Sequence, residues 1–202
     1  MDLENTLIMS LESGPVTITL RPDLAPQHVA RIKELAREGF YDGVVFHRVI
    51  PGFMAQGGDP TGTGTSGSNK PNLPAEFSKE THIRGVCSMA RTANPNSANS
   101  QFFLMRQPYP ALDKRYTVWG RVVSGLDVVR ALKFSPNPDG IVSDPDRMTR
   151  VRVAGDLAEA ERPTVRVLST SSAPFRALVE TTRTARGADF SVCDIDLPVQ
   201  VD

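Results

Sequence analysis

The stretch FHRVIPGFMAQGGDP, residues 46–60, carries the strongest structural signal in this chain of 202 residues. Two short runs typical of β-strands, 44–50 and 53–56, lie on either side of a Pro-Gly turn, which predicts an antiparallel pair. Strand alternation would place Phe46 and Arg48 on one face of this pair, beside a large apolar surface.

The position of Arg48 allows two interpretations. An arginine against aromatic side chains, with the amide of Gln56 close by, suits a shallow pocket that holds one strong hydrogen-bond donor. An arginine whose charged head reaches water from a strand edge would leave the same pattern. From the pattern alone the two interpretations weigh equally.

Outward from this stretch the chain is rich in short strands and poor in helices. A helix is predicted from Pro26 to Glu38, and Ser124 to Asp127 resembles a capping box that opens a second helix ending at Leu132. Further strands are predicted at 6–11, 16–20, 86–90, 101–105, 117–123 and 148–153. Many strands with two helices favour a closed antiparallel sheet, either a barrel or a sandwich.

The character of the sequence changes after about Asp156. Segments typical of a strand, a helix and a strand follow at 165–168, 175–186 and 190–195. We therefore predict a main domain over residues 1–156 and a small β-α-β extension over residues 157–202. The extension is short for an independent domain, so we expect it to pack on the main domain or on a partner.

Composition excludes several classes of function. Lys plus Arg and Asp plus Glu number 23 each, so the net charge of zero predicts no binding to nucleic acid or to an anionic membrane. The N-terminus lacks the basic segment of a secretory signal, which predicts a cytoplasmic protein and leaves the periplasm open.

Neither a metal nor a cofactor is expected. The three histidines show no spacing typical of metal ligands. Cys87 and Cys193 are expected to be buried or half-buried thiols, with a single disulfide between them as the alternative. Residues 62–67 match the pattern GxGxxG, but no strand precedes them and no helix follows. We interpret this segment as a tightly turning loop, not a dinucleotide site.

A second group of small residues, amides and aromatics contains SMA at 88–90 and NSQFF at 99–103. With residues 46–60 and GTG at 62–64, these motifs resemble, in order and spacing, the cyclophilin family of peptidyl-prolyl cis/trans isomerases. The resemblance covers about residues 5–156. It implies a mostly β fold, a closed eight-stranded antiparallel barrel capped by two helices, which agrees with the elements predicted above.

The resemblance also implies a function and a site. The expected activity is rotation about Xaa-Pro bonds in peptides and folding chains, without a cofactor, and Arg48, Phe53 and Gln56 are the implied catalytic residues. The residues implied to bind the substrate are Met54, Ala90, Arg91, Gln101, Phe103, Leu112 and Tyr116. A peptide-docking or chaperone-like scaffold with incidental isomerase activity is the alternative, and the complete set of pocket residues favours the enzyme.

Two positions differ from the best-known eukaryotic members and look like bacterial members. Ala111 stands where those members carry tryptophan, and Tyr116 stands where they carry histidine. The missing indole is expected to weaken the binding of cyclosporin-type ligands. Tyr116 still supplies a ring and a hydroxyl group, so the pocket can remain closed.

Overall fold

The structure, a computed structural model, describes residues 2–162 of the chain. The predicted β-α-β extension, including Cys193, lies outside the described residues, apart from its first few positions. Those positions form a single turn of 3-10 helix at Glu159–Glu161.

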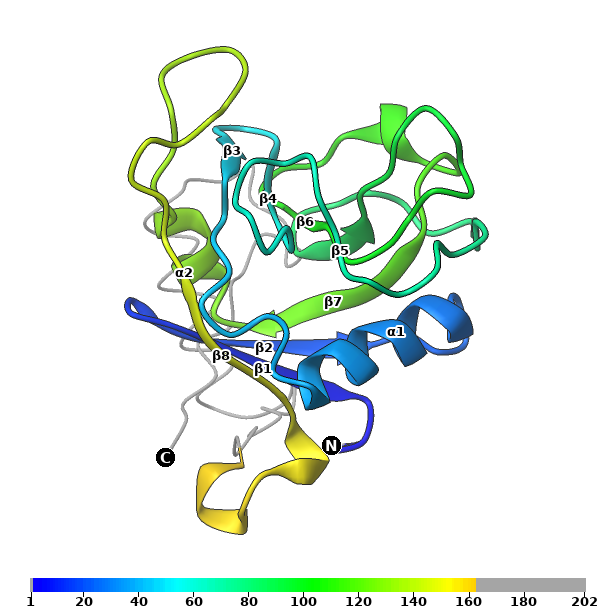
Figure 1. Ribbon diagram of the computed structural model, residues 1–202, viewed down its shortest axis with the longest axis vertical. Helices are drawn as coiled ribbons and strands as arrows, with labels where there is room; N and C mark the ends of the chain where they lie inside the picture. Colours follow the sequence, from blue (N-terminus) through cyan, green and yellow to red (C-terminus); the bar gives the residue numbers. More distant parts are fainter. Residues whose placement is uncertain (1, 163–202) are drawn as a thin grey trace, which may run out of the picture. The chain divides into compact units, whose positions relative to one another are not determined.

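Eight antiparallel strands form one strongly curled sheet (Figure 1). Their order across the sheet is β3-β4-β6-β5-β7-β2-β1-β8. The strands are β1 (Thr6–Leu11), β2 (Gly14–Leu20), β3 (Arg48–Ile50), β4 (Met54–Gly57), β5 (Val86–Met89), β6 (Phe102–Met105), β7 (Val118–Ser124) and β8 (Met148–Val153). The predicted mostly β fold with eight antiparallel strands is confirmed.

The two edge strands of the sheet, β3 and β8, do not pair directly with each other. Two isolated bridges instead connect this edge to the segment before β8: Val45, just before β3, pairs with Arg147, and Arg48 of β3 pairs with Ile141. The predicted closed barrel is therefore observed as a curled sheet whose edges are joined through the loop that precedes β8.

The first helix, α1 (Pro26–Arg37), agrees with the prediction and packs against β7 and β8. Proline suits the first helical turn, since the N–H that it lacks would have no helical partner there. The helix buries Val29, Ile32 and Leu35 on one face, which is the apolar stripe expected from their spacing.

The second helix, α2 (Leu126–Ala131), packs against β2, but the predicted capping box is wrong. Ser124 is the last residue of β7, and the N-cap is Gly125, which makes no side-chain cap bond. The φ of Gly125 is +83°, and a Cβ at this position would collide with the carbonyl oxygen of Pro15. Close approach of the chain to β2 therefore decides how this helix begins.

Interlocking aromatic rings fill the core of the curled sheet. Phe102 meets Tyr41, Phe46 and Trp119 edge to face, at centroid distances of 5.6, 6.2 and 5.7 Å. Phe46 thus belongs to the core, and the prediction that it shares a face with Arg48 is wrong. Regular strand geometry begins only at Arg48, so alternation does not extend back to Phe46.

Candidate active site

Residues from three adjacent strands and three connecting segments enclose a pocket of about 150 Å³. All the predicted site residues except Gln101 line it: Arg48, Phe53, Met54, Gln56, Ala90, Arg91, Phe103, Leu112 and Tyr116. Gln101 lies directly behind Gln56 and lines a second, adjoining cavity.

Strand register brings the polar part of the pocket together. Arg48 on β3 is paired with Gln56 on β4, and Gln56 is paired with Phe103 on β6. Residues paired directly across antiparallel strands project from the same face of the sheet. The guanidinium, the amide and the aromatic ring therefore stand side by side.

Apolar side chains form the floor and walls of the pocket. Met54 and Phe103 are buried, and the ring of Phe103 meets Tyr116 edge to face at 5.6 Å. Leu112 packs against the buried cluster that contains Met54 and Phe103. The ring of Phe53 contacts that of Tyr109, with the two ring centres 4.4 Å apart. Such a cup, with aromatic walls and two arginines, Arg48 and Arg91, in its lining, suits a small apolar ring.

Arg48 is held by two neutral acceptors. Its Nε donates to the main-chain oxygen of Asp139 at 2.8 Å, and its Nη1 donates to Oε1 of Gln56 at 3.4 Å. Within residues 2–162 no carboxylate forms an ion pair with this guanidinium. The positive charge at the pocket is therefore not neutralised by an acidic neighbour in this part of the chain.

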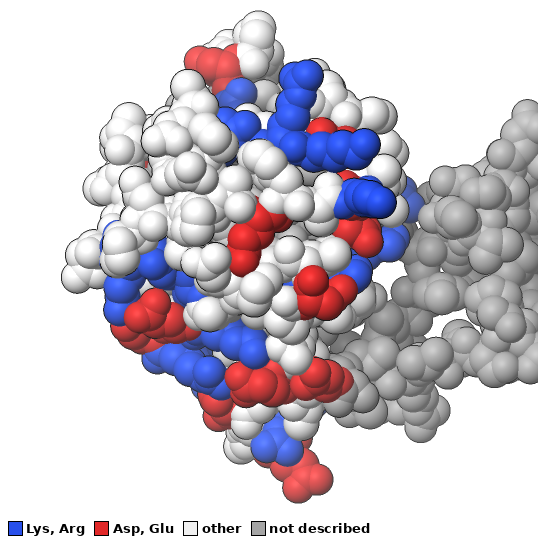
Figure 2. Space-filling view, turned by 90° about the vertical axis from the view of Figure 1, so that its right-hand side faces the viewer, with Lys and Arg blue, Asp and Glu red and all other residues white. Residues whose placement is uncertain are grey.

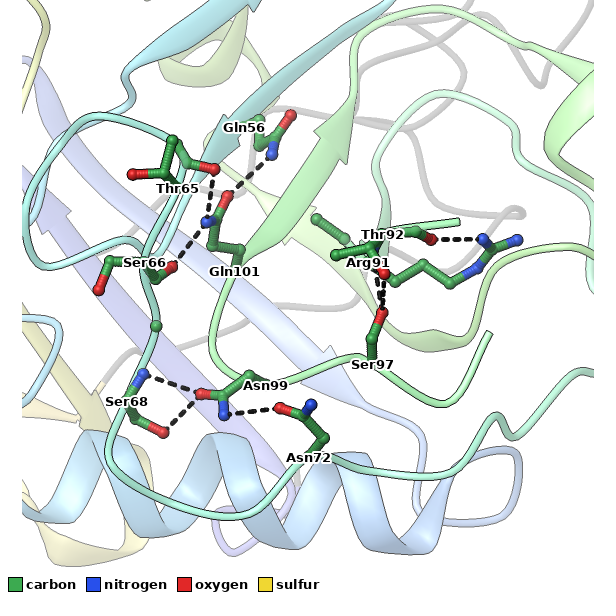
Figure 3. Close-up of a pocket in the computed structure, with 13 residues that line it drawn as sticks. Gln56, Thr65, Ser66, Ser68, Asn72, Arg91, Thr92, Ser97, Asn99 and Gln101 are labelled. Atoms are coloured by element: carbon green, nitrogen blue, oxygen red, sulfur yellow. Dashed lines mark hydrogen bonds between the residues drawn. The ribbon is translucent and has the colours of Figure 1, made fainter. Parts of the chain in front are cut away.

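A chain of amides fixes the orientation of Gln56 (Figure 3). Nε2 of Gln101 donates to the main-chain oxygens of Gly64, at 3.0 Å, and Ser66, at 2.7 Å, so its Oε1 faces Gln56. Nε2 of Gln56 donates to that oxygen at 3.0 Å. The Oε1 of Gln56 is consequently directed to Arg48, because an amide has only one acceptor end.

The second cavity, of about 380 Å³, adjoins the apolar pocket and shares Gln56, Ala90 and Arg91 with it. Most of its remaining lining is polar and comes from the segments 64–68 and 97–101 (Figure 3). Sequence reasoning missed this cavity, although the concentration of Gly, Ser, Thr and Asn in both segments was a signal for it.

The segment 62–67 is the turning loop that the sequence predicted, and a buried carboxylate organises it. Asp59 accepts hydrogen bonds from the main-chain N–H groups of Thr61, Gly64 and Ser66, at 2.8, 2.6 and 3.2 Å. The hydroxyls of Thr61 and Thr63 also donate to it. Burial alone would raise the pKa of Asp59, but these hydrogen bonds outweigh it and lower the pKa to about 2.

Arg91 lies between the two cavities with its guanidinium 4.5 Å from the ring centre of Tyr116. Its Nη2 donates to the main-chain oxygen of Arg115 at 2.7 Å, and its Nη1 donates to that of Thr92. Cation–π contact and hydrogen bonds together hold both side chains in place. Arg91 thus supports Tyr116, one wall of the apolar pocket.

Behind the pocket, a buried histidine joins two segments that sequence reasoning did not connect. Nδ1 of His82 lies 3.0 Å from Oδ1 of Asp113, and its Nε2 lies 3.0 Å from the hydroxyl of Ser88. Its ring also stacks on Phe103 at 6.2 Å. Desolvation by burial lowers the pKa of His82, although its contact with Asp113 opposes this shift.

Charges of both signs are mixed on one face of the molecule. Lys and Arg side chains alternate with Asp and Glu over the face shown in Figure 2. Among residues 2–162, no group of three or more His, Cys, Asp or Glu side chains is arranged to hold a metal ion.

Cys87 is buried, as predicted, and burial raises the pKa of its thiol. No helix in the same part of the chain has the length and apolar character needed to cross a membrane.

Comparison with known proteins identifies many relatives. The family model described as cyclophilin type peptidyl-prolyl cis-trans isomerase/CLD matches residues 6–153. A probable peptidyl-prolyl cis-trans isomerase of Brucella suis is 53% identical over 167 residues, which cover 77% of this chain and 85% of the relative. The peptidyl-prolyl cis-trans isomerase B of Bacillus subtilis is 44% identical over 147 residues, covering 72% and 95%.

A solved structure shows the same similarity. The crystal structure of the cyclophilin AquaCyp293 from Hirschia baltica superimposes with a TM-score of 0.76 at 31% sequence identity. The alignment covers 96% of this chain and 88% of that one.

Proposed function

The chain belongs to the cyclophilin family of peptidyl-prolyl cis-trans isomerases, and from this premise we propose how its pocket carries out the reaction. The activity is interconversion of the cis and trans forms of Xaa-Pro bonds, and the substrates are proline-containing peptides. We propose that Arg48 stabilises the twisted amide, while the apolar cup formed with Phe53, Met54 and Phe103 holds the proline ring.

The chemistry requires no bond to break. Resonance gives the amide C–N bond partial double-bond character, and the barrier to its rotation is about 18–20 kcal/mol. Halfway through the rotation this resonance is lost, and the prolyl nitrogen regains a lone pair. A hydrogen-bond donor placed at that nitrogen binds the twisted state more tightly than either planar state, which is what accelerates a reaction.

The observation that carries this assignment is the place of Arg48 at the edge of a cup without a neutralising carboxylate in the described chain. Its two observed bonds use Nε and Nη1, so other N–H groups of the guanidinium remain for a substrate. A guanidinium also keeps its charge over the whole working range of pH. It can therefore act as a hydrogen-bond donor without a change of protonation.

The energy of one hydrogen bond is too small to explain the whole rate acceleration, so Arg48 must act together with the cup. A charge-assisted hydrogen bond contributes about 1.5–3 kcal/mol, and each tenfold in rate requires about 1.36 kcal/mol. The bond to Arg48 therefore supplies about one or two factors of ten. Holding the ring still in a pocket that excludes water must supply the rest.

Gln56 and Gln101 act on Arg48 through the amide chain. Because Gln101 is fixed by two main-chain oxygens, Gln56 presents its Oε1 to the guanidinium. That oxygen keeps a second lone pair for an N–H group of the bound peptide. The adjoining polar cavity offers further hydrogen-bonding groups to residues next to the proline.

The experiment compares Arg48→Ala with the wild-type chain in the isomerisation of an Ala-Pro tetrapeptide. We expect kcat/KM to fall at least about tenfold, because the smallest contribution of one charge-assisted bond is about that large. The loss should lie mainly in kcat, since the proposed bond forms in the transition state.

The matched control is Arg121→Ala, which removes an exposed arginine from β7. It should retain full activity, and both variants should unfold at the wild-type temperature. Wild-type turnover in Arg48→Ala would remove this residue from the mechanism.

The proposal extends to clients and ligands. We propose that the enzyme acts on folding chains as well as on short peptides, and that it binds cyclosporin-type ligands weakly. The alternative is a docking scaffold with incidental isomerase activity. Deleting the residues after about Asp156 and measuring both turnover and association state would separate the two functions.

A further inference from the structure

The loop between α2 and β8 runs along the outer edge of β3, on the side opposite β4 (Figure 1). The N–H of Val49 donates to the main-chain oxygen of Gly140 at 2.8 Å, and the N–H of Val142 donates to that of His47 at 3.0 Å. Ile141 forms an isolated bridge with Arg48. The loop therefore lies beside the strand that carries the arginine.

This register places one particular carbonyl against the guanidinium. The main-chain oxygen of Asp139 accepts from Nε of Arg48 at 2.8 Å, while Gln56 accepts from Nη1 at the longer distance of 3.4 Å. The shorter of the two bonds comes from the loop. Since the guanidinium is planar, an acceptor at Nε restricts the plane in which the remaining N–H groups lie.

The distance between loop and strand depends on a glycine. The φ of Gly140 is +74°, and a Cβ at this position would lie 2.5 Å from Cγ1 of Ile50. Any larger residue must push the loop away from β3 or displace Ile50. Ile50 packs against the buried apolar cluster that includes Met54 and Phe103. The glycine thus permits the close approach that brings the carbonyl of Asp139 to Arg48.

The loop also fixes its own turn. Oδ1 of Asp139 accepts from the N–H of Ile141 at 3.0 Å, and the N–H of Gly140 donates to the main-chain oxygen of Asn137 at 3.0 Å. These two bonds orient the peptide unit between Asp139 and Gly140. Its carbonyl is therefore directed at Arg48 before a substrate binds.

We propose that the Asp139–Gly140 peptide unit is a positioning element of the enzyme, which aims the guanidinium of Arg48 at the prolyl nitrogen. The inference rests on the proposed role of Arg48. It assigns the loop no contact with the substrate. Its effect on the reaction passes through Arg48 alone.

The principal test is Gly140→Ala, made in the wild-type chain and in the Arg48→Ala chain. In the wild-type chain we expect kcat to fall about three- to tenfold, with KM changed less than about twofold, because the cup that holds the ring remains. In the Arg48→Ala chain the same substitution should cause no further loss, since the group that it misplaces is already absent.

The matched control is Gly43→Ala. Gly43 also has a positive φ, +82°, but a Cβ at this position would meet nothing within 4 Å. This control reproduces the backbone strain of the test variant without moving the loop away from Ile50. We expect its kcat to stay within about twofold of wild type.

A second pair of variants serves if Gly140→Ala does not fold. Asp139 is exposed, so Asp139→Ala should fold, and it removes the side-chain oxygen that holds the N–H of Ile141. We expect kcat to fall about two- to fivefold. Asp139→Asn keeps an acceptor oxygen, so its kcat should be close to that of the wild-type chain. If the loss in Asp139→Ala came from the missing negative charge, Asp139→Asn would be as slow as Asp139→Ala, and this would overturn the role of the hydrogen bond.

A spectroscopic measurement reports the position of Arg48 independently of turnover. The Nε–H resonance of Arg48, assigned by its loss in Arg48→Lys, should shift upfield and exchange faster with solvent in both Gly140→Ala and Asp139→Ala. Unchanged resonances in both variants would overturn the proposal.

The kinetic outcomes separate this inference from the proposed function. Full activity of Gly140→Ala in an enzyme that needs Arg48 overturns the positioning role and leaves the proposed function intact. An equal loss in the presence and absence of Arg48 also overturns it, because the effect would then pass through the fold or the cup. Wild-type activity of the single variant Arg48→Ala would remove Arg48 from the proposed mechanism, and would overturn this inference with it.

Discussion

Replacing Asp59 by asparagine should destabilise the protein in a way that depends on pH. The carboxylate is fully buried and accepts hydrogen bonds from three main-chain N–H groups and two threonine hydroxyls. An asparagine retains only one acceptor oxygen. In place of the second carboxylate oxygen stands an NH₂ group, which would face N–H and O–H donors. The substitution therefore removes the favourable charge and leaves donors without acceptors.

The structure sets the magnitude of the effect. The pKa of Asp59 falls from 3.8 to about 2, and one pKa unit corresponds to about 1.36 kcal/mol. The ionised carboxylate thus contributes about 2 kcal/mol of stability at pH 7. Because the folded-state pKa is the lower one, this contribution is complete well above pH 3.8 and is lost as the pH falls through 2. At pH 3 about 1 kcal/mol should remain.

The assay is urea unfolding of the full-length wild-type and Asp59→Asn chains at pH 7 and pH 3. We expect the variant to be less stable by at least about 2 kcal/mol at pH 7, and this deficit to shrink by about 1 kcal/mol at pH 3. Asp144→Asn is the control, since the side chain of Asp144 is 89% exposed, and its stability should follow that of the wild-type chain.

Two results would refute this reasoning. A variant as stable as the wild-type chain at pH 7 would mean that the hydrogen bonds do not favour the charged form. A deficit of the same size at both pH values would mean that the loss comes from packing, not from ionisation.

Two further predictions concern acid stability and ligand binding. Burial lowers the pKa of His28, His47 and His82 below 6.5. As the pH falls, the unfolded chain therefore binds protons before the folded one, and the free energy of unfolding should decrease from pH 7 to pH 5. A free energy from urea unfolding that stays constant over this range would contradict the prediction. Ala111→Trp should tighten the binding of a cyclosporin-type ligand at least about tenfold, because an indole at this exposed position adds apolar area and a donor worth about 1.4 kcal/mol or more. Inhibition of turnover by such a ligand measures it, and an unchanged inhibition constant would show that the missing indole is not what weakens binding.

Local patterns predicted the regular elements well. The bounds of β1 and β8 agree with those predicted, and α1 agrees within one residue at its end. β8 and α1 each bury one face and expose the other, so the spacing of their apolar residues repeats with the period of the element. The pairing of β3 with β4 also followed from the sequence, because a Pro-Gly turn joins two adjacent strands.

The same reasoning failed where distant parts of the chain meet. Phe46 and the start of α2 were assigned wrongly, because the core around Phe102 and the close approach to Pro15 override local preference. The set of pocket residues was predicted from resemblance to a family, and no spacing in the sequence would have joined Arg48 to Leu112. Only the fold brings them to one pocket.

Local patterns are sufficient to predict the short-range features of this protein: the strands, the helices, the tight turn after β3 and the family to which the motifs point. The fold is needed to predict which distant groups meet, such as His82 with Asp113, and Arg48 with the carbonyl of Asp139, 91 positions further along the chain. The reason is physical. The periodicity of apolar residues indicates which face of one element is buried. A main-chain oxygen is present in every residue, so its hydrogen-bond partner cannot be predicted from residue type and depends on the packing of the fold.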